Sequence, residues 1–123
     1  MIDYAEAQAA CETYIRSLQD SDVETLLALF DDNASIEDPV GTELREGKSA
    51  LREFYSVACE GVLSAALSGA PRLAGNEVAF PFTVTAGTVG EELTINIIDV
   101  FKFNEAGKVV SMRAFWGPNN IGN

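Results

Sequence analysis

The sequence of 123 residues contains no histidine. Histidine is the commonest general base near neutral pH and the commonest metal ligand, so its absence leaves carboxylates, tyrosines and backbone groups to carry any chemistry. The sequence also lacks a glycine-rich phosphate loop before a helix, a cysteine cluster and a serine nucleophile elbow. These absences remove several common enzyme sites, metal centres among them, from consideration.

Basic residues are also few. Eight lysines and arginines stand against nineteen aspartates and glutamates, which gives a formal net charge of −11. This charge repels phosphate backbones and anionic lipids, so we expect no nucleic acid or membrane partner. The sequence has no run of about twenty apolar residues, which a helix needs to span a bilayer. Charged residues interrupt Met1–Leu18, where a signal peptide would be apolar. We expect one cytoplasmic domain covering residues 1–123.

Cysteine is scarce. Cys11 and Cys59 each fall in a helical pattern beside apolar neighbours. Without a secretory signal, a disulfide between them is disfavoured. We expect both thiols to be reduced, buried and unreactive.

The order of the predicted elements indicates an α+β domain. Apolar residues at helical spacing predict helices over about 3–19 and 48–60, and a capping box at Ser21-Asp22-Val23-Glu24 predicts another that ends near Asp31. A short extended segment precedes Pro39, and strands are predicted over about 63–73, 77–89, 92–104 and 108–116. Pro81 has no N–H to donate and should lie at a sheet edge or a bulge. Helices followed by strands predict helices packed on one face of an antiparallel sheet.

Asp99 interrupts the most apolar strand face in the sequence. Strand side chains alternate between two faces, and the face that contains Asp99 otherwise holds apolar residues: Leu93, Ile95, Ile97, Phe101 and Phe103. An ionised carboxylate without a partner is too costly to bury and normally takes up a proton. Asp99 is therefore either a structural oddity or an acid kept neutral to donate a hydrogen bond.

Three more polar residues lie on apolar faces. Tyr14 and Tyr55 fall on the inward stripes of their helices, and Asp38 shares a face with Ile36. Each alone has an ordinary structural explanation, since a core tyrosine ties off its hydroxyl and an aspartate before proline is usually a turn residue. Two carboxyls in one apolar cavity, however, can differ widely in pKa, with Asp38 as ionised base and Asp99 as neutral acid. A tyrosine beside that acid would add a second donor to a developing oxyanion, which suits proton abstraction next to a carbonyl.

These residues occur in segments that together resemble the bacterial Δ5-3-ketosteroid isomerases (steroid delta-isomerases) of the nuclear-transport-factor-2-like superfamily. The segments are Glu12-Thr13-Tyr14-Ile15-Arg16, Ile36-Glu37-Asp38-Pro39-Val40-Gly41, Arg52-Glu53-Phe54-Tyr55, residues 97–103 around Asp99, and residues 107–114. The resemblance covers residues 5 to 121. This family is the known case of one carboxyl kept neutral beside a carboxyl base.

The resemblance implies a cone-shaped, cystatin-like α+β fold. Three N-terminal helices would pack on a curved, mostly antiparallel sheet around a deep apolar pocket, and two chains would form a homodimer. The reaction implied is the transfer of a proton from C4 to C6 of a 3-oxo-Δ5 steroid, without a cofactor or a metal. Asp38 would be the base, Tyr14 and protonated Asp99 would donate to the dienolate oxygen, and Tyr55 would support Tyr14.

Two positions of the resemblance vary among the relatives, which have Tyr in some members where this chain has Phe30, and Trp or Phe where it has Trp116. With Phe30, the supporting hydroxyl network would be shorter. Trp116 has two open roles: its indole N–H hydrogen-bonds Asp38, or its ring only packs on the steroid. The candidate substrate-binding walls are Phe54, Phe82, Val84, Phe101, Met112 and Trp116.

Two alternatives to an isomerase stay open. One is another enzyme on the same fold, of the epoxide hydrolase or polyketide cyclase type; a hydrolase would need an arginine between two carboxylates to activate water. The other is a non-catalytic binder of hydrophobic ligands. The carboxylate of Asp38 argues against the binder, because binding alone gains nothing from a charge on an apolar wall.

Overall fold

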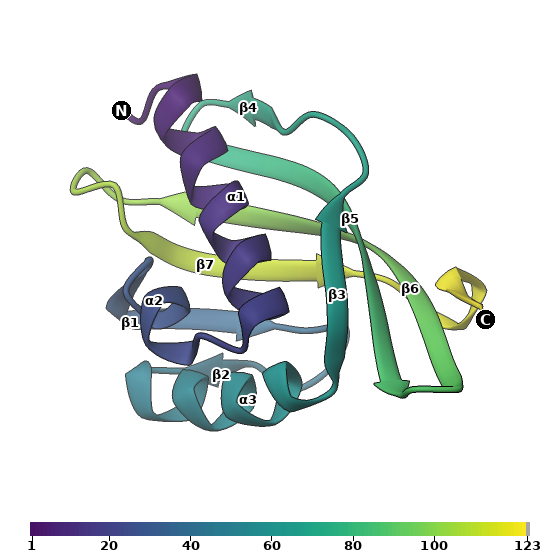
Figure 1. Cartoon of the computed structure of the whole chain (residues 1–123). Coiled ribbons are helices and arrows are strands. Elements are labelled where there is room, and N and C mark those ends of the chain that lie inside the picture. Colours follow the sequence, from purple (N-terminus) through teal and green to yellow (C-terminus); the bar gives the residue numbers. More distant parts are fainter. Residues whose placement is uncertain (123) are drawn as a thin grey trace.

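The computed structural model describes residues 1–122 as three α-helices and eight strands, with a 3₁₀ helix near the C-terminal end (Figure 1). The helices are α1 (Tyr4–Asp20), α2 (Val23–Leu27) and α3 (Lys48–Glu60), and the 3₁₀ helix is η1 (Pro118–Asn120). The strands are β1 (Phe30–Glu37), β2 (Arg45–Glu46), β3 (Val62–Leu67), β4 (Arg72–Ala74), β5 (Glu77–Thr88), β6 (Glu91–Phe103), β7 (Val109–Phe115) and β8 (Ile121–Gly122). None of the described helices is long and apolar enough to cross a membrane.

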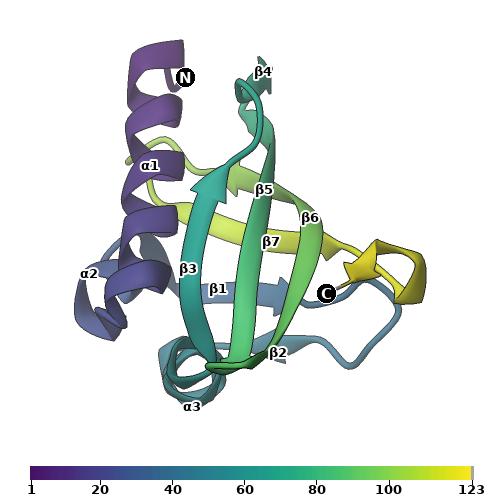
Figure 2. The ribbon, with the colours of Figure 1, turned by 45° about the vertical axis from the view of Figure 1, so that its right-hand side comes forward.

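The strands form one mixed sheet, and the helices cover its concave face. The strand order is β2-β1-β7-β6-β5-β3, with β4 paired to β5 and β8 paired to β6. Only the β1–β7 pairing among these is parallel, and the others are antiparallel. Figure 2 shows β5 and β6 bending strongly, with α1 and α3 on the inner side of the curve. The predicted α+β architecture with a curved, mostly antiparallel sheet is confirmed.

Helix α1 has clear start and stop signals. The Asp3 carboxylate accepts the Glu6 N–H at 2.8 Å and Glu6 accepts the Asp3 N–H, which completes a capping box. The helix ends at Ser21, whose φ of 55° is left-handed. Cys11 and Tyr14 lie on its buried stripe, as the spacing predicted.

Both cysteines are buried and free, in agreement with the sequence-based expectation. Burial is the main cause that raises the pKa of the Cys11 thiol to about 12. A thiol in this state is a poor nucleophile, because only the thiolate reacts.

Two predicted boundaries are wrong. Helix α2 ends at Leu27 rather than near Asp31, and Phe30 instead begins a strand. The Asp31 carboxylate accepts the Asn33 N–H at 3.0 Å, and such local side-chain bonds compete with helix continuation. The segment predicted as one strand over 63–73 divides into β3 and β4, because Pro71 offers no N–H to a ladder.

Pro81 lies in strand β5 between the last residue paired with β3 and the first residue paired with β4, so β5 has a local open edge there and the prediction of an edge position is confirmed on that side. Its carbonyl accepts the Ser68 N–H at 3.0 Å, at the break between the end of β3 and the start of β4. The ring nitrogen of Pro81 faces the same side as its carbonyl and therefore the same break. Proline is tolerated there because no ladder hydrogen bond is required of it.

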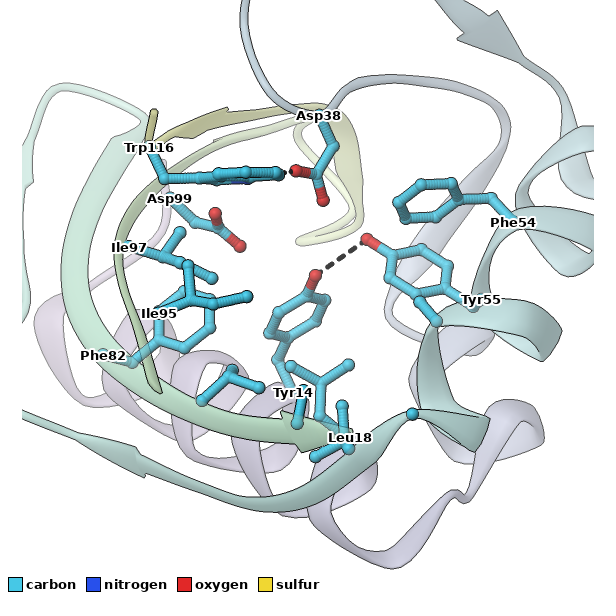
Figure 3. Close-up of a pocket in the computed structure, with 15 residues that line it drawn as sticks. Tyr14, Leu18, Asp38, Phe54, Tyr55, Phe82, Ile95, Ile97, Asp99 and Trp116 are labelled. Carbon is cyan, nitrogen blue, oxygen red and sulfur yellow. Dashed lines mark hydrogen bonds between the residues drawn. The ribbon is translucent and has the colours of Figure 1, made fainter. Parts of the chain in front are cut away.

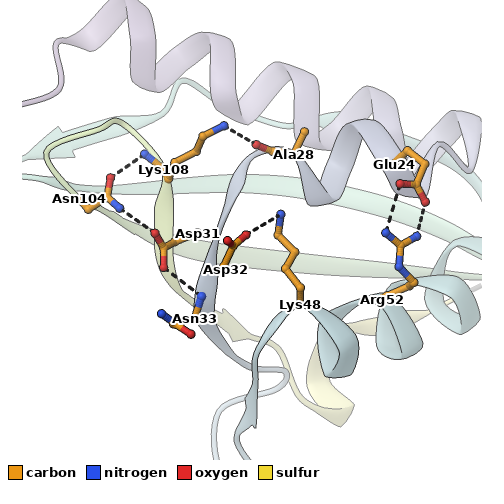
Figure 4. A network of polar contacts seen from close by, with 9 residues as sticks. All are labelled: Glu24, Ala28, Asp31, Asp32, Asn33, Lys48, Arg52, Asn104 and Lys108. Carbon is orange, nitrogen blue, oxygen red and sulfur yellow. Dashed lines mark hydrogen bonds and ion pairs between the residues drawn. The ribbon is translucent and has the colours of Figure 1, made fainter.

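Polar contacts hold the β6–β7 turn and helix α3 in place (Figure 4). Asn104 donates to Asp31 at 3.2 Å, and Lys108 donates to the Ala28 carbonyl at 2.8 Å. On the helical side, Arg52 pairs with Glu24. Solvent screens an exposed ion pair such as Arg52–Glu24, so these contacts orient elements whose stability comes mainly from the core.

Candidate active site

An apolar cavity of about 240 Å³ lies between the helices and the concave face of the sheet (Figure 3). Its lining is Tyr14, Leu18, Asp38, Phe54, Tyr55, Ala58, Gly61, Val62, Phe82, Val84, Ala86, Ile95, Ile97, Asp99 and Trp116. Two carboxyl groups and two phenol hydroxyls are thus placed among mainly hydrocarbon walls. This lining contains no lysine or arginine.

Asp99 is the most unusual group in the cavity. It lies on β6 between Phe80 of β5 and Ala114 of β7, and only 1 % of it is exposed. Its Oδ1 atom is buried and has no hydrogen-bond partner in the part of the chain that the structure describes. Burial, and secondly the charge of Asp38, raise the pKa of Asp99 well above its usual value, while the Tyr14 hydroxyl opposes the rise. Burial and the charge of Asp38 both favour the neutral, protonated form of Asp99.

Asp38 has a different environment. It directly follows β1, and its Oδ1 accepts the indole N–H of Trp116 at 2.8 Å. Figure 3 shows its other oxygen directed into the cavity. Partial burial raises the pKa of Asp38, but the Trp116 hydrogen bond and then the charge of Arg45 work against the rise. Asp38 therefore ionises more readily than Asp99 and suits the role of a base.

Tyr14 and Tyr55 form a buried hydroxyl pair. Their oxygens are 2.9 Å apart, and either group can be the donor. The Tyr14 ring makes edge contacts with Phe80, Phe82 and Phe101 at centroid distances of 5.1 to 6.4 Å, which limit its movement. Burial raises the pKa of both phenols well above the usual value, so both stay protonated. With Tyr55 as donor, the Tyr14 proton is free for a ligand.

The predicted wall residues divide into two groups. Phe54, Phe82, Val84 and Trp116 line the cavity. Phe101 and Met112 do not line it; both are fully buried in the core. The two residues pair across β6 and β7, and the Tyr14 ring covers Phe101 at 5.1 Å. Their assignment as walls is wrong because α1 closes the inner face of the sheet beyond Asp99.

Several lining residues escaped the sequence-based prediction. Ile95 and Ile97 share the predicted inward face with Asp99, and Leu18 lies one helical turn after Tyr14, so periodicity could have identified them. Ala58 lies one helical turn after Phe54, and Ala86 shares a strand face with Phe82 and Val84, so periodicity also applies to them. Gly61 and Val62 gave no such signal. They line the cavity because the end of α3 and the curved strands come together there.

Comparison with known proteins identifies the family. The model of the SnoaL-like domain matches residues 11–112. The chain belongs to the SnoaL-like family. A steroid delta-isomerase of Nocardioides simplex is 34% identical over 117 residues, which are 95% of this chain and 94% of that protein. The resemblance to steroid delta-isomerases is confirmed.

Other SnoaL-like relatives are named for epoxide chemistry. The epoxide hydrolase LasB of Streptomyces lasalocidi is 32% identical over 110 residues, which are 85% of this chain but only 39% of LasB. A solved structure described as the epoxide hydrolase/cyclase-like enzyme SalBIII, with a role in pyran ring formation in the polyether salinomycin, has a TM-score of 0.89. It is 31% identical and covers 99% of this chain and 98% of its own. The fold is therefore nuclear-transport-factor-2-like, and the relatives are enzymes.

The cavity of this SnoaL-like domain combines a carboxyl group that ionises more readily with two groups whose neutral forms are favoured. Asp38 can accept a proton, whereas Asp99 and Tyr14 can each donate a hydrogen bond inside the same apolar space. Donors held in a site of low dielectric stabilise a developing oxyanion far better than water does. The arrangement can therefore move a proton next to a carbonyl whose oxygen lies at Asp99.

Proposed function

We propose that this protein is a steroid Δ-isomerase, which converts a 3-oxo-Δ5 steroid to its conjugated 3-oxo-Δ4 isomer without a cofactor. The observation that carries the proposal is the pair of carboxyls in one apolar cavity. Asp99 has a buried oxygen without a partner, and Asp38 has an oxygen held by the Trp116 N–H at 2.8 Å. The 34% identity to a steroid delta-isomerase supports the same reaction.

The proposed mechanism has two proton transfers. The Asp38 carboxylate removes a proton from C4, and the electrons move through the carbonyl to give a dienolate with negative charge on the C3 oxygen. Asp99 and Tyr14 donate hydrogen bonds to that oxygen, and Tyr55 orients Tyr14 through the 2.9 Å contact. Protonated Asp38 then returns the proton to C6, which restores the carboxylate and leaves the double bond conjugated.

The direct test is an isomerase assay. The purified protein is incubated with 5-androstene-3,17-dione, and the ultraviolet absorbance of the conjugated enone is followed. We expect enzyme-dependent growth of this absorbance. Binding of the steroid with no increase over buffer would reject the isomerase and favour the non-catalytic binder.

A second candidate is intramolecular opening of an epoxide, favoured by the TM-score of 0.89 to the SalBIII structure. Here Asp99 would protonate the epoxide oxygen while Asp38 removes the proton of an attacking hydroxyl. Activation of water by an arginine is less well supported, because Arg113 does not line the cavity. Its side chain instead pairs with the Glu37 carboxylate at a distance of 3.3 Å. A hydroxy-epoxide assayed beside the steroid separates the candidates, because a cyclase would close the ring and leave the steroid unchanged.

We also propose that the protein is a homodimer, as its steroid delta-isomerase relatives are expected to be. Ile98 and Phe115 are cross-strand neighbours on β6 and β7, and they are 48 % and 42 % exposed. An apolar pair on an open sheet face gains stability when it is covered. Sedimentation should give about twice the chain mass of 13.2 kDa, and a monomer at micromolar concentration would reject the dimer.

A further inference from the structure

A second hollow of about 460 Å³ lies beside the catalytic cavity, between α3 and the segment that holds Glu43 and Arg45. Phe54 and Ala58, which are one helical turn apart on α3, line both spaces. Figure 3 shows Phe54 on the side of the cavity away from Asp99. The hollow, called the α3 groove below, therefore shares Phe54 and Ala58 with the catalytic cavity as a common wall.

Arg45 is the cation of the α3 groove. Its guanidinium carbon lies 4.9 Å from the centroid of the Phe54 ring, in a cation–π contact. Arg52 and Arg113 have carboxylate partners, but Arg45 has neither an ion pair nor a side-chain hydrogen bond within residues 1–122. A guanidinium carries five N–H donors, so those of Arg45 are available to a ligand.

The sizes of the two spaces suggest that one ligand occupies both. The catalytic cavity of about 240 Å³ is smaller than typical small-molecule pockets, which enclose about 300 to 1,000 Å³. The catalytic cavity and the α3 groove together fall well within that range. A ligand with its reacting carbonyl at Asp99 would have to pass Phe54 and Ala58, the shared wall, to occupy the groove as well.

The chemistry of the groove limits what that extension can be. Ala50 and Val57 provide apolar surface, which suits a hydrocarbon chain. Glu43 and Glu53 also line the groove and would repel a carboxylate on the ligand. A neutral oxygen acceptor, such as an ester or ketone, avoids this repulsion and can accept from Arg45.

We propose that the α3 groove is a subsite for the side chain of the steroid, and that Arg45 determines specificity by donating hydrogen bonds to a neutral oxygen on that chain. This inference rests on the proposed isomerase function. It names the preferred substrate class as 3-oxo-Δ5 steroids that carry a long side chain with an oxygen acceptor.

The test compares three substrates with the native protein and three variants. The substrates are 5-androstene-3,17-dione, which has no side chain, cholest-5-en-3-one, which has a hydrocarbon chain, and methyl 3-oxochol-5-en-24-oate, which has a chain with an ester. The variants are Arg45→Met, Val57→Asp and, as a matched control outside the groove, Arg52→Met. Each kcat/KM is divided by that for 5-androstene-3,17-dione, because this ratio cancels any common effect of Arg45 on the Asp38 base.

For Arg45→Met, we expect the kcat/KM ratio of the ester substrate to fall about tenfold, because a hydrogen bond from a charged donor is lost. The ratio of the hydrocarbon substrate should stay within about twofold of the native value. Val57 is 70 % exposed, so Val57→Asp should fold normally and lower both ratios at least about threefold, because it places a charge beside the chain. Arg52→Met should change neither ratio. Unchanged ratios in both groove variants would reject the subsite, whereas native protein inactive on all three steroids would reject the isomerase itself.

Discussion

At the scale of single residues, two aspartates in one cavity differ through their neighbours. Asp38 has the Trp116 N–H at 2.8 Å, while the buried Oδ1 of Asp99 has no partner in the described chain. A hydrogen bond to the charged form favours ionisation, and burial without one favours the neutral form. The same side chain is therefore suited to act as a base at one position and as an acid at the other.

Replacing the base tests its role directly. Asp38→Asn keeps the size of the side chain but cannot accept a proton from C4, so we expect kcat to fall by about 10² to 10⁴-fold. Binding of equilenin, a phenolic steroid that resembles the dienolate, should survive, as measured by its fluorescence. Retained turnover would show that another group removes the proton.

Replacing Asp99 tests whether this residue acts as a neutral hydrogen-bond donor or as a charged group. Asp99→Asn retains an N–H donor and should lower kcat less than about tenfold, whereas Asp99→Leu removes the donor and should cost about 10² to 10³-fold. Steady-state kinetics on 5-androstene-3,17-dione measures both. A loss in Asp99→Asn as large as that in Asp38→Asn would mean that Asp99 acts ionised.

Trp116 should set the pH range of activity. Its hydrogen bond lowers the pKa of Asp38 against the effect of burial, so Trp116→Phe should raise that pKa. The base must be ionised to act, and the acid limb of the kcat/KM profile should therefore move to higher pH. An unmoved limb with a raised KM would instead indicate that the ring only packs on the steroid.

At the scale of elements, the residues on one face of strand β6 lie in three different environments: partly exposed, lining the cavity, and buried in the core. Leu93, near the start of the strand, is 46 % exposed. Ile95, Ile97 and Asp99 line the cavity, and Phe101 is fully buried in the core. The alternation along the strand stays regular throughout. The environments differ because helix α1 packs on this face near Tyr14, whose ring contacts Phe101.

This change of environment predicts unequal effects of truncation along β6. Phe101→Ala leaves a void under the Tyr14 ring and should lower the free energy of unfolding by about 3 to 5 kcal/mol, with reduced kcat because Tyr14 is less well held. Leu93→Ala, on the same face, should cost less than about 1 kcal/mol. Urea unfolding of both variants provides the measurement, and similar losses would contradict the proposed difference in packing.

At the scale of the whole molecule, the raised pKa of Asp99 affects stability. A carboxyl whose pKa is raised on folding binds its proton more tightly in the folded than in the unfolded chain, where the value is about 3.9. Its favourable contribution is complete below that value. It is lost progressively as pH rises above about 3.9 toward the folded pKa.

Comparison with Asp99→Asn isolates this effect, since asparagine does not titrate. From about pH 4 upward, the variant should gain stability relative to the native protein by up to about 1.4 kcal/mol per pH unit, until Asp99 ionises in the native fold. Urea unfolding across a pH series measures the difference. A constant difference above pH 5 would indicate an Asp99 with an ordinary pKa.

The local pattern predicted much of the fold and the polar part of the site. Helical spacing placed Tyr14 and Tyr55 inward, and strand alternation placed Asp99 on a buried face. The errors fell where local signals compete. Phe30 fits either the end of a helix or the start of a strand, and its contact with the Tyr55 ring at 5.9 Å belongs to the strand position.

The sequence by itself determined which way each side chain faces, because the periods of helix and strand are local properties of the backbone. The buried position of Asp99 and the inward position of Tyr14 follow from this. Only the tertiary structure decided which inward residues meet, how far the cavity extends, and that Trp116 reaches Asp38 across 78 residues of chain. These depend on the curvature of the sheet and on where α1 and α3 cover it, which no local period encodes. Phe101 shares the predicted strand face with Asp99 but lies in the core, because α1 packs on that face at Phe101.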